Sequence, residues 1–99
     1  IKIIDKKVIG FSNVSLRHDY VEGTETSPVA YLEGIFVDEE YRRKGYGKEL
    51  LLACENWARK MDCKEFASDS LLDNINSYNF HLASGFVEAN RIICYKKDL

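Results

Sequence analysis

Arg42-Arg43-Lys44-Gly45-Tyr46-Gly47 is the stretch that decides the fold. It lies between a strand-like apolar run over residues 31–37 and a helical pattern over residues 48–61. Two glycines at the start of a helix let the backbone approach a bound group closely. The unpaired N–H groups of the first helical turn then favour an anion. Because basic residues precede the glycines, the stretch predicts a site for a phosphate or pyrophosphate.

The spacing of this stretch also restricts the kind of anion. It matches neither GxxxxGK[ST] nor GxGxxG, the loops typical of ATP and dinucleotide sites. Both ligands are therefore disfavoured. A plain glycine-tolerant turn between strand and helix, with a solvated basic face, remains an alternative.

The remaining sequence predicts an α/β chain in the order strand, strand, strand, helix, strand, helix, strand. Strands are expected over residues 1–4, 8–21, 31–37, 64–68 and 86–97, and helices over residues 48–61 and 74–84. Three apolar stripes are expected to face the core: Val14, Leu16, His18 and Tyr20 on the second strand; Leu50, Cys54, Trp57, Ala58 and Met61 on the first helix; Ile75, Tyr78 and Leu82 on the second helix.

Composition is that of an ordinary soluble domain. The 99 residues carry a net charge of −2, and 45% of them are apolar. No apolar run approaches the roughly 20 residues that span a bilayer, so no membrane partner is expected. The three cysteines lack CxxC spacing, which predicts reduced thiols in a cytoplasmic protein. No metal is expected, because neither histidine has ligand spacing with a cysteine.

The spacing Arg42-x-x-Gly45-x-Gly47 resembles the acyl-CoA loop of the GNAT acetyltransferases, and the segment LASGF at residues 82–86 resembles the end of their last helix. The resemblance implies a mixed, mostly antiparallel central sheet with helices packed on it. The first strand and helices of the family have no counterpart here. Residues 1–99 are therefore expected to form a single GNAT acetyltransferase domain that corresponds to the C-terminal portion of the family domain.

Four further segments resemble one branch of that family, the aminoglycoside 6′-N-acetyltransferases, which are bacterial antibiotic-resistance enzymes. They are RHDYVEGT (17–24), SPVAYLEGIFV (27–37), EFASD (65–69) and LDN (72–74). Agreement of several segments in order is more specific than one short motif. The resemblance implies transfer of an acetyl group from acetyl-CoA to the 6′-amino group of an aminoglycoside.

The same resemblance assigns binding residues. Acceptor contacts are expected from Tyr20, Glu33 and Asp69, and from Glu88 or Asn90, where the family has a carboxylate near the acceptor. Contacts with acetyl-CoA are expected along the strand, the loop and the second helix: Ile35, Phe36, Val37, Arg42, Arg43, Lys44, Gly45, Tyr46, Gly47, Lys48 and Asn74.

Glu33, Asp69 and His81 are the candidate catalytic residues. Carboxylates bind a cationic amine by charge-assisted hydrogen bonds, and Glu33 stands in an otherwise apolar strand, where an unpaired charge is costly. Glu33 is a candidate to accept the amine's proton, directly or through water. His81 occupies the position of a tyrosine that protonates the leaving thiolate in many GNAT enzymes. Solvated or capping roles for the carboxylates, and a packing role for His81, remain alternatives.

Two other readings of the function stay open. Another amine, such as a polyamine, suits the same carboxylates, and a truncated chain could bind CoA or dimerise without turnover. A homodimer is expected, because an uncovered apolar sheet face favours association. A nucleic-acid partner is disfavoured, because the basic cluster is single and the net charge is negative.

Overall fold

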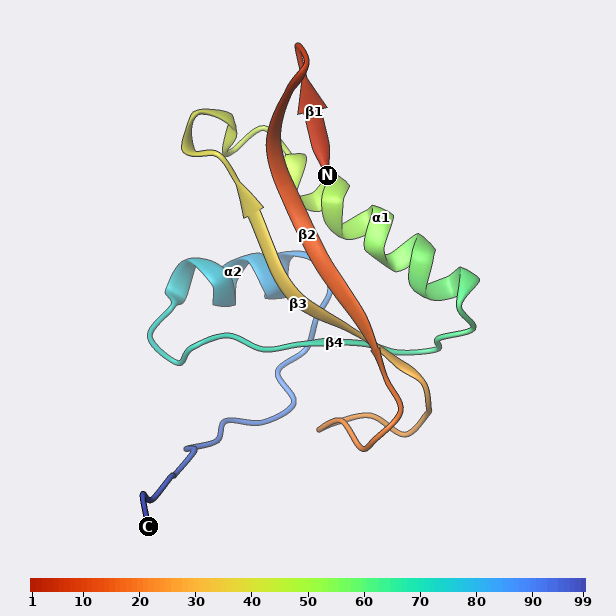
Figure 1. The fold of residues 1–99 in the computed structure, drawn as a ribbon, viewed down its shortest axis with the longest axis vertical. Coiled ribbons are helices and arrows are strands. Elements are labelled where there is room, and N and C mark those ends of the chain that lie inside the picture. The colour runs from red at the N-terminus through yellow and green to blue at the C-terminus, as the bar shows by residue number, and fades with distance from the viewer. The chain divides into compact units, whose positions relative to one another are not determined.

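The computed structural model describes all 99 residues (Figure 1). The elements follow one another in the order β1 (Lys2–Ile4), β2 (Lys7–Arg17), β3 (Val29–Val37), the 3-10 helix η1 (Glu39–Tyr41), α1 (Tyr46–Lys60), β4 (Phe66–Ser68) and α2 (Ile75–Ala83). The chain divides into an N-terminal unit, residues 1–69, and a C-terminal unit, residues 70–99. Each unit is described by itself.

One sheet of four strands, in the order β1-β2-β3-β4, forms the frame of the N-terminal unit. The pairs β1–β2 and β2–β3 are antiparallel, and the pair β3–β4 is parallel. The expected mixed, mostly antiparallel sheet is confirmed. The turn between β1 and β2 is Asp5-Lys6, and both residues have positive φ, as the tightest hairpin turns require.

The helix α1 packs against β2 and β3. Ala30 of β3, Ala58 of α1 and Cys63 form a buried cluster, and Val14, Leu16, Trp57 and Phe66 pack around it. The expected helix stripe is confirmed at Leu50, Cys54 and Ala58, which are all buried. Met61 is exposed because α1 ends one residue before it, so that part of the prediction is wrong.

Gly10 lets this helix lie close to the sheet. A Cβ atom on Gly10 would stand 2.7 Å from the carbonyl oxygen of Phe36 and 3.3 Å from Cδ1 of Leu50. Any larger side chain would push against the neighbouring strand and the first turns of α1. The glycine thus fixes the distance between β2, β3 and the start of the helix.

The second strand is shorter than expected. It ends at Arg17, so His18 and Tyr20, expected on the core face with Val14 and Leu16, lie beyond the strand and are exposed. Alternate side chains point to opposite faces of the sheet only along a paired strand. The pairing of β2 with β3 ends at Arg17↔Val29.

A second buried cluster lies on the face of the sheet opposite α1. It contains Val21, Val29 and Tyr31, with Ala67 packed against it. Successive side chains of a strand point to opposite faces, and Ala30 packs against α1. Tyr31 therefore faces away from the helix, and this face carries the polar groups described below.

The C-terminal unit contains α2 and no strand. Asn74 caps the helix, its side chain accepting a hydrogen bond from the backbone N–H of Ser77. No residue of α2 is buried, and the expected inner face of Ile75, Tyr78 and Leu82 is exposed. The prediction of a strand over residues 86–97 is also wrong. A strand needs a hydrogen-bonded neighbour, and this unit offers none.

Neither helix has the length and apolar character needed to cross a membrane.

Candidate functional site

The loop before α1 has the geometry of an anion site. Gly45 is the N-cap of α1 with a φ of 84°, and Arg43, two residues earlier, has a φ of 63°. No side chain caps the helix, so its first-turn N–H groups stay available to a ligand. A Cβ on Gly45 would meet nothing within 4 Å. Backbone N–H groups in left-handed turns at a helix start form concavities that bind anions.

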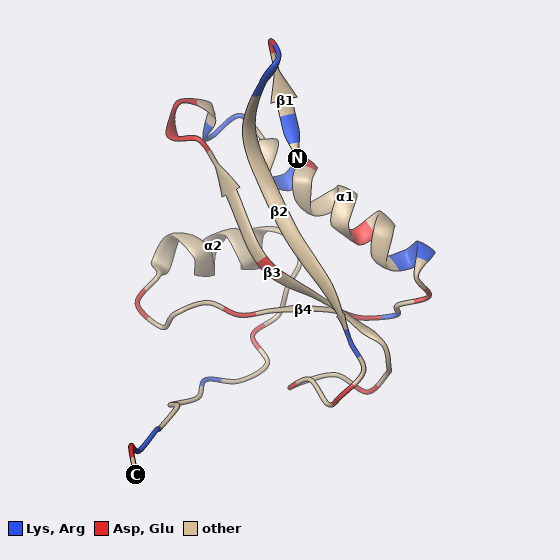
Figure 2. Cartoon of the chain, in the orientation of Figure 1, with Lys and Arg blue, Asp and Glu red and all other residues tan.

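Charge changes sign along the approach to this loop. Glu39 and Glu40 of η1 are acidic, and the loop that follows carries three basic residues, as the red and blue segments before α1 show (Figure 2). Arg42 is turned back toward the sheet: its Nε donates to the carbonyl oxygen of Val37 at 2.9 Å. Arg43 and Lys44 are exposed beside the glycine. The positive charge is therefore concentrated at the helix start.

The strand β3, which leads to this loop, is irregular at Glu33. Asn13 pairs with Gly34 and Val14 pairs with Leu32, so Glu33 is the extra residue of a β-bulge. Pairing with β4 ends at Leu32↔Ser68, although β3 continues to Val37. Residues 33–37, which include the CoA contacts expected from the strand, thus have no strand on the β4 side. Their backbone groups on that edge can bind an extended ligand.

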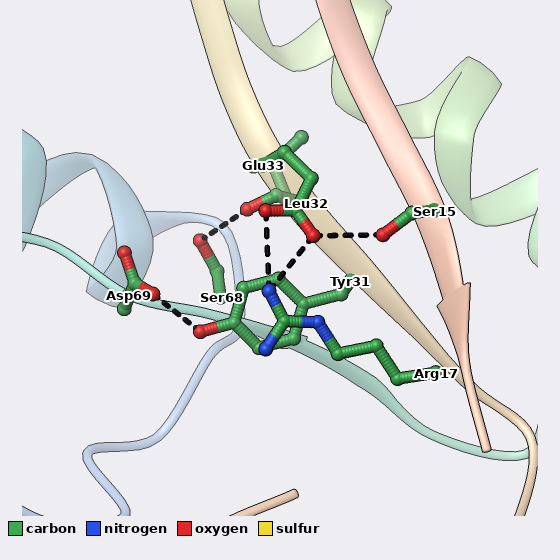
Figure 3. Close-up of polar contacts among 7 residues, drawn as sticks. All are labelled: Ser15, Arg17, Tyr31, Leu32, Glu33, Ser68 and Asp69. Carbon is green, nitrogen blue, oxygen red and sulfur yellow. Dashed lines mark hydrogen bonds and ion pairs between the residues drawn. The ribbon is translucent and has the colours of Figure 1, made fainter. Parts of the chain in front are cut away.

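Glu33 stands in an otherwise apolar stretch of the sequence, yet its side chain is exposed and is paired with Arg17. Its Oε1 accepts hydrogen bonds from Nη2 of Arg17 at 2.8 Å and from Oγ of Ser15 at 2.7 Å (Figure 3). These bonds, Arg17's first, lower the pKa of the Glu33 carboxyl below its usual value. The group is suited to hold a cation and is a weak base.

Asp69 lies directly after β4 and is held by Tyr31. The hydroxyl of Tyr31 donates to Oδ2 of Asp69 at 2.5 Å. Burial of the ring, and then this hydrogen bond, raise the pKa of Tyr31 to about 12. The hydroxyl therefore stays protonated and remains a donor at neutral pH.

Two residues that connect these carboxylates, Arg17 and Tyr31, were not singled out from the sequence. The Cζ atom of Arg17 lies 3.5 Å from the centre of the Tyr31 ring (Figure 3). One signal was present: Ser15 and Arg17 alternate with the core residues Val14 and Leu16 along β2. Polar side chains at that spacing share the opposite face.

The remaining expected acceptor residues are Tyr20, Glu88 and Asn90. Tyr20 is largely exposed in the loop after β2. Glu88 and Asn90 belong to the C-terminal unit. Glu88 forms an ion pair with Arg91, and the side chain of Asn90 accepts from the backbone N–H of Arg91.

His81, the candidate acid, is half-buried in α2. Its Nδ1 lies 2.7 Å from the carbonyl oxygen of Ser77, so Nδ1 is the donor in that contact. Its ring also packs against Phe80 and Phe86, with centroids 5.9 and 5.0 Å away. The imidazole ring is therefore packed between aromatic side chains and is oriented by the contact of its Nδ1 with Ser77. Asn74, the expected CoA contact of this unit, uses its side-chain oxygen to cap α2.

No group of three or more His, Cys, Asp or Glu side chains is arranged to hold a metal ion. All three cysteines are free thiols; Cys54 and Cys63 are buried and Cys94 is exposed. The Sγ of Cys54 lies 3.1 Å from Oγ of Ser12, inside the contact between α1 and β2. Cys54 thus has the packing role expected for it.

A bulged central strand leads into an uncapped, glycine-bearing helix start, the arrangement expected of an acyl-CoA loop. The chain belongs to the acetyltransferase (GNAT) family, whose model matches residues 2–86.

Particular members of that family are similar over nearly the whole chain. Aminoglycoside N(6′)-acetyltransferase type 1 of Acinetobacter baumannii is 48% identical, covering 95% of this chain and 64% of the relative. The Serratia marcescens protein of the same name is 43% identical, covering 97% of this chain and 66% of the relative. The structure of AAC(6′)-Iy with a bisubstrate analogue, CoA-S-monomethyl-acetylneamine, superposes with a TM-score of 0.93 at 43% identity, covering 98% of this chain and 66% of that one. The chain spans about two thirds of the length of these relatives.

Proposed function

We propose that this chain is an acetyl-CoA-dependent N-acetyltransferase that acetylates the 6′-amino group of an aminoglycoside and so contributes to antibiotic resistance. The observation that carries the proposal is the course of β3. This strand holds the carboxylate Glu33 at its bulge, continues as an edge without a β4 partner, and leads to the helix start at Gly45. The names of the relatives support the same activity.

In this proposal, the acyl donor lies along β3 and the loop. The backbone of Ile35, Phe36 and Val37 binds the extended pantetheine arm, and the N–H groups of residues 43–48 bind the pyrophosphate. A backbone N–H on the β3 edge that faces the thioester oxygen would stabilise the negative charge that develops there. Asn74 is retained as a proposed further contact.

The acceptor lies at the carboxylates. An aminoglycoside carries several ammonium groups, and Glu33 and Asp69 bind such groups by charge-assisted hydrogen bonds. Tyr20 supplies an exposed ring for the sugar, and Glu88 or Asn90 supplies a last polar contact. Glu33 is the proposed acceptor of the ammonium's proton, either directly or through a bound water that passes the proton to the carboxylate.

The reaction needs no covalent enzyme intermediate. The neutral amine attacks the thioester carbonyl carbon and the C–N bond forms. The nitrogen gives up its remaining extra proton to solvent, and the C–S bond breaks as the tetrahedral intermediate collapses. His81 is the proposed source of the proton for the leaving thiolate. The Ser77 carbonyl holds Nδ1, so the imidazolium form would donate from Nε2.

The proposed setting is a cytoplasmic homodimer in which residues 1–99 form one portion of a GNAT domain. The free thiols are compatible with a reducing compartment. The neighbouring rings of Phe11 and Phe36 are both exposed on the sheet, and such apolar surface favours self-association. Sedimentation velocity at two protein concentrations tests the dimer.

Release of free thiol from acetyl-CoA tests the activity, with kanamycin, tobramycin, spermidine or no acceptor. Release that depends on the aminoglycosides is the expected result. Release with spermidine alone would favour the second candidate, a polyamine acetyltransferase, because the two carboxylates suit any polycation. No release from a chain that binds CoA by calorimetry would contradict both and leave a binding function.

A further inference from the structure

Four side chains form a continuous line across the sheet face opposite α1 (Figure 3). Arg17 reaches Glu33 at one end, with Nη2 2.8 Å from Oε1 and 3.2 Å from Oε2. The Arg17 guanidinium lies on the ring of Tyr31, and the hydroxyl of Tyr31 donates to Asp69 at the other end. All four residues belong to the N-terminal unit. The two acceptor carboxylates are thus connected through two residues that have no assigned role.

Stability alone does not account for this arrangement. The side chains of Arg17 and Glu33 are 43% and 33% exposed, and ion pairs in contact with solvent contribute little to the free energy of folding. Tyr31, by contrast, is only 7% exposed, so the platform on which Arg17 lies is part of the packed core. Arg17 is held by that ring and by Glu33 together, which restricts the position of the carboxylate.

The hydrogen bonds leave room for a ligand on both carboxylates. Oε1 of Glu33 accepts from both Ser15 and Arg17, whereas Oε2 has only the longer bond to Arg17. On Asp69, Tyr31 occupies Oδ2. A carboxylate oxygen has two acceptor sites, so Oε2 of Glu33 and Oδ1 of Asp69 retain capacity for ammonium donors.

We propose that Arg17 and Tyr31 are positioning residues that hold Glu33 and Asp69 at a fixed separation, so that the site selects acceptors with two ammonium groups over acceptors with one. This proposal rests on the acceptor role given to the two carboxylates above. Arg17 also places a positive charge between them, which offsets their mutual repulsion. The charged and titratable groups near Glu33 are then Arg17 from β2, Tyr31 from β3 and Asp69 after β4.

Three substitutions separate the parts of this arrangement. Arg17→Met removes the positive charge and the planar guanidinium but keeps an unbranched side chain. Tyr31→Phe keeps the ring but removes the hydrogen bond from the hydroxyl to Asp69. Each is expected to lower the preference for two ammonium groups about tenfold, the usual effect of losing one charge-assisted hydrogen bond. Arg17→Lys keeps the charge without the planar fork, so it should restore part of the preference lost in Arg17→Met.

Calorimetric binding of neamine, which has several amines, and of 6-amino-6-deoxyglucose, which has one, measures the preference on the full chain without turnover. Arg59→Met and Tyr95→Phe are matched controls on exposed residues, and circular dichroism verifies the fold of every variant. Loss of preference in Arg17→Met and Tyr31→Phe, with unchanged CoA affinity, is the expected result. A wild-type ratio in both folded variants, or no preference in the wild type, would overturn the proposal.

The pH profile of binding distinguishes positioning from a general structural role. Arg17 is the main donor that lowers the pKa of Glu33. In Arg17→Met the acid side of the neamine-binding profile should therefore move to higher pH. Equal profiles in the wild type and Arg17→Met would contradict the role given to Arg17. Intact selective binding without thiol release would instead contradict only the proposed catalysis.

Discussion

The donor and acceptor halves of the proposed site are built from different chemical groups. The donor half uses the backbone: the open edge of β3, the left-handed turn at Gly45 and the first turn of α1. The acceptor half uses side chains from β2, from β3 and from the end of β4. The donor half is continuous in the sequence, whereas the acceptor half exists only where distant segments meet in register. Substitutions should therefore affect the two halves independently.

The donor half depends first on the docking of α1, and two adjacent leucines test this. Leu51 is 2% exposed and Leu52 is 53% exposed. Leu51→Ala should lower the free energy of unfolding by about 2–5 kcal/mol, because it leaves a cavity in the core. Leu52→Ala should change the free energy by less than about 0.5 kcal/mol. Denaturant titration measures both, and equal losses would contradict the described packing.

Gly45→Val should remove CoA affinity and leave the preference for amines in place. Valine is branched at Cβ and resists the φ of 84° at this position, at a cost of roughly 1–3 kcal/mol. With the lost backbone approach, we expect at least about a 100-fold loss by calorimetry. Gly45→Asn is the control, because asparagine tolerates this conformation. Normal CoA binding by folded Gly45→Val would disprove the loop assignment.

Glu33→Gln and Asp69→Asn should affect the opposite half. Each removes one negative charge without changing the shape of the side chain. We expect kcat/KM for kanamycin to fall about 10- to 100-fold, the size of a charge-assisted hydrogen bond, with CoA affinity unchanged. Glu55→Gln on the surface of α1 is the matched control. Wild-type kinetics in both variants would show that the acceptor binds elsewhere.

Glu65 gives the smallest predicted effect. Its Oε1 accepts from the backbone N–H groups of Glu25 and Thr26, both at 2.9 Å, and from the Thr26 hydroxyl, and thus anchors the loop between β2 and β3. These bonds, the hydroxyl's first, lower its pKa. The anchor is present above the ordinary glutamate pKa and is lost as pH falls through the lowered value.

Glu65→Gln should raise amide hydrogen exchange at Glu25 and Thr26 about tenfold at neutral pH, with less than about a twofold change in kcat/KM. Because the loop joins strands of the acceptor half, CoA affinity should not change at all. Unchanged exchange at both amides in the variant would show that another contact holds the loop.

The contrast between the two helices shows which structural features the sequence patterns could predict. Both were predicted from apolar spacing, and both exist. The stripe of α1 is buried because β2 and β3 lie under it, whereas the residues expected to form the inner face of α2 are exposed. The strand expected after Gly85 failed for a related reason. Spacing describes which residues share a face, but burial and pairing depend on a neighbour.

The sequence by itself determined the loop and helix start of the proposed donor half, because their geometry is local. Glycine at a helix start, basic residues before it and an apolar strand upstream act through the backbone of adjacent residues. It also indicated Glu33 and Asp69 as single carboxylates. Only the tertiary structure decided how these groups are used. The register of β2 against β3 places Arg17 opposite Val29, so that its side chain lies over Tyr31 and reaches Glu33. The strand β4 brings Asp69 to Tyr31. Long-range pairing creates these contacts, and no local pattern contains them.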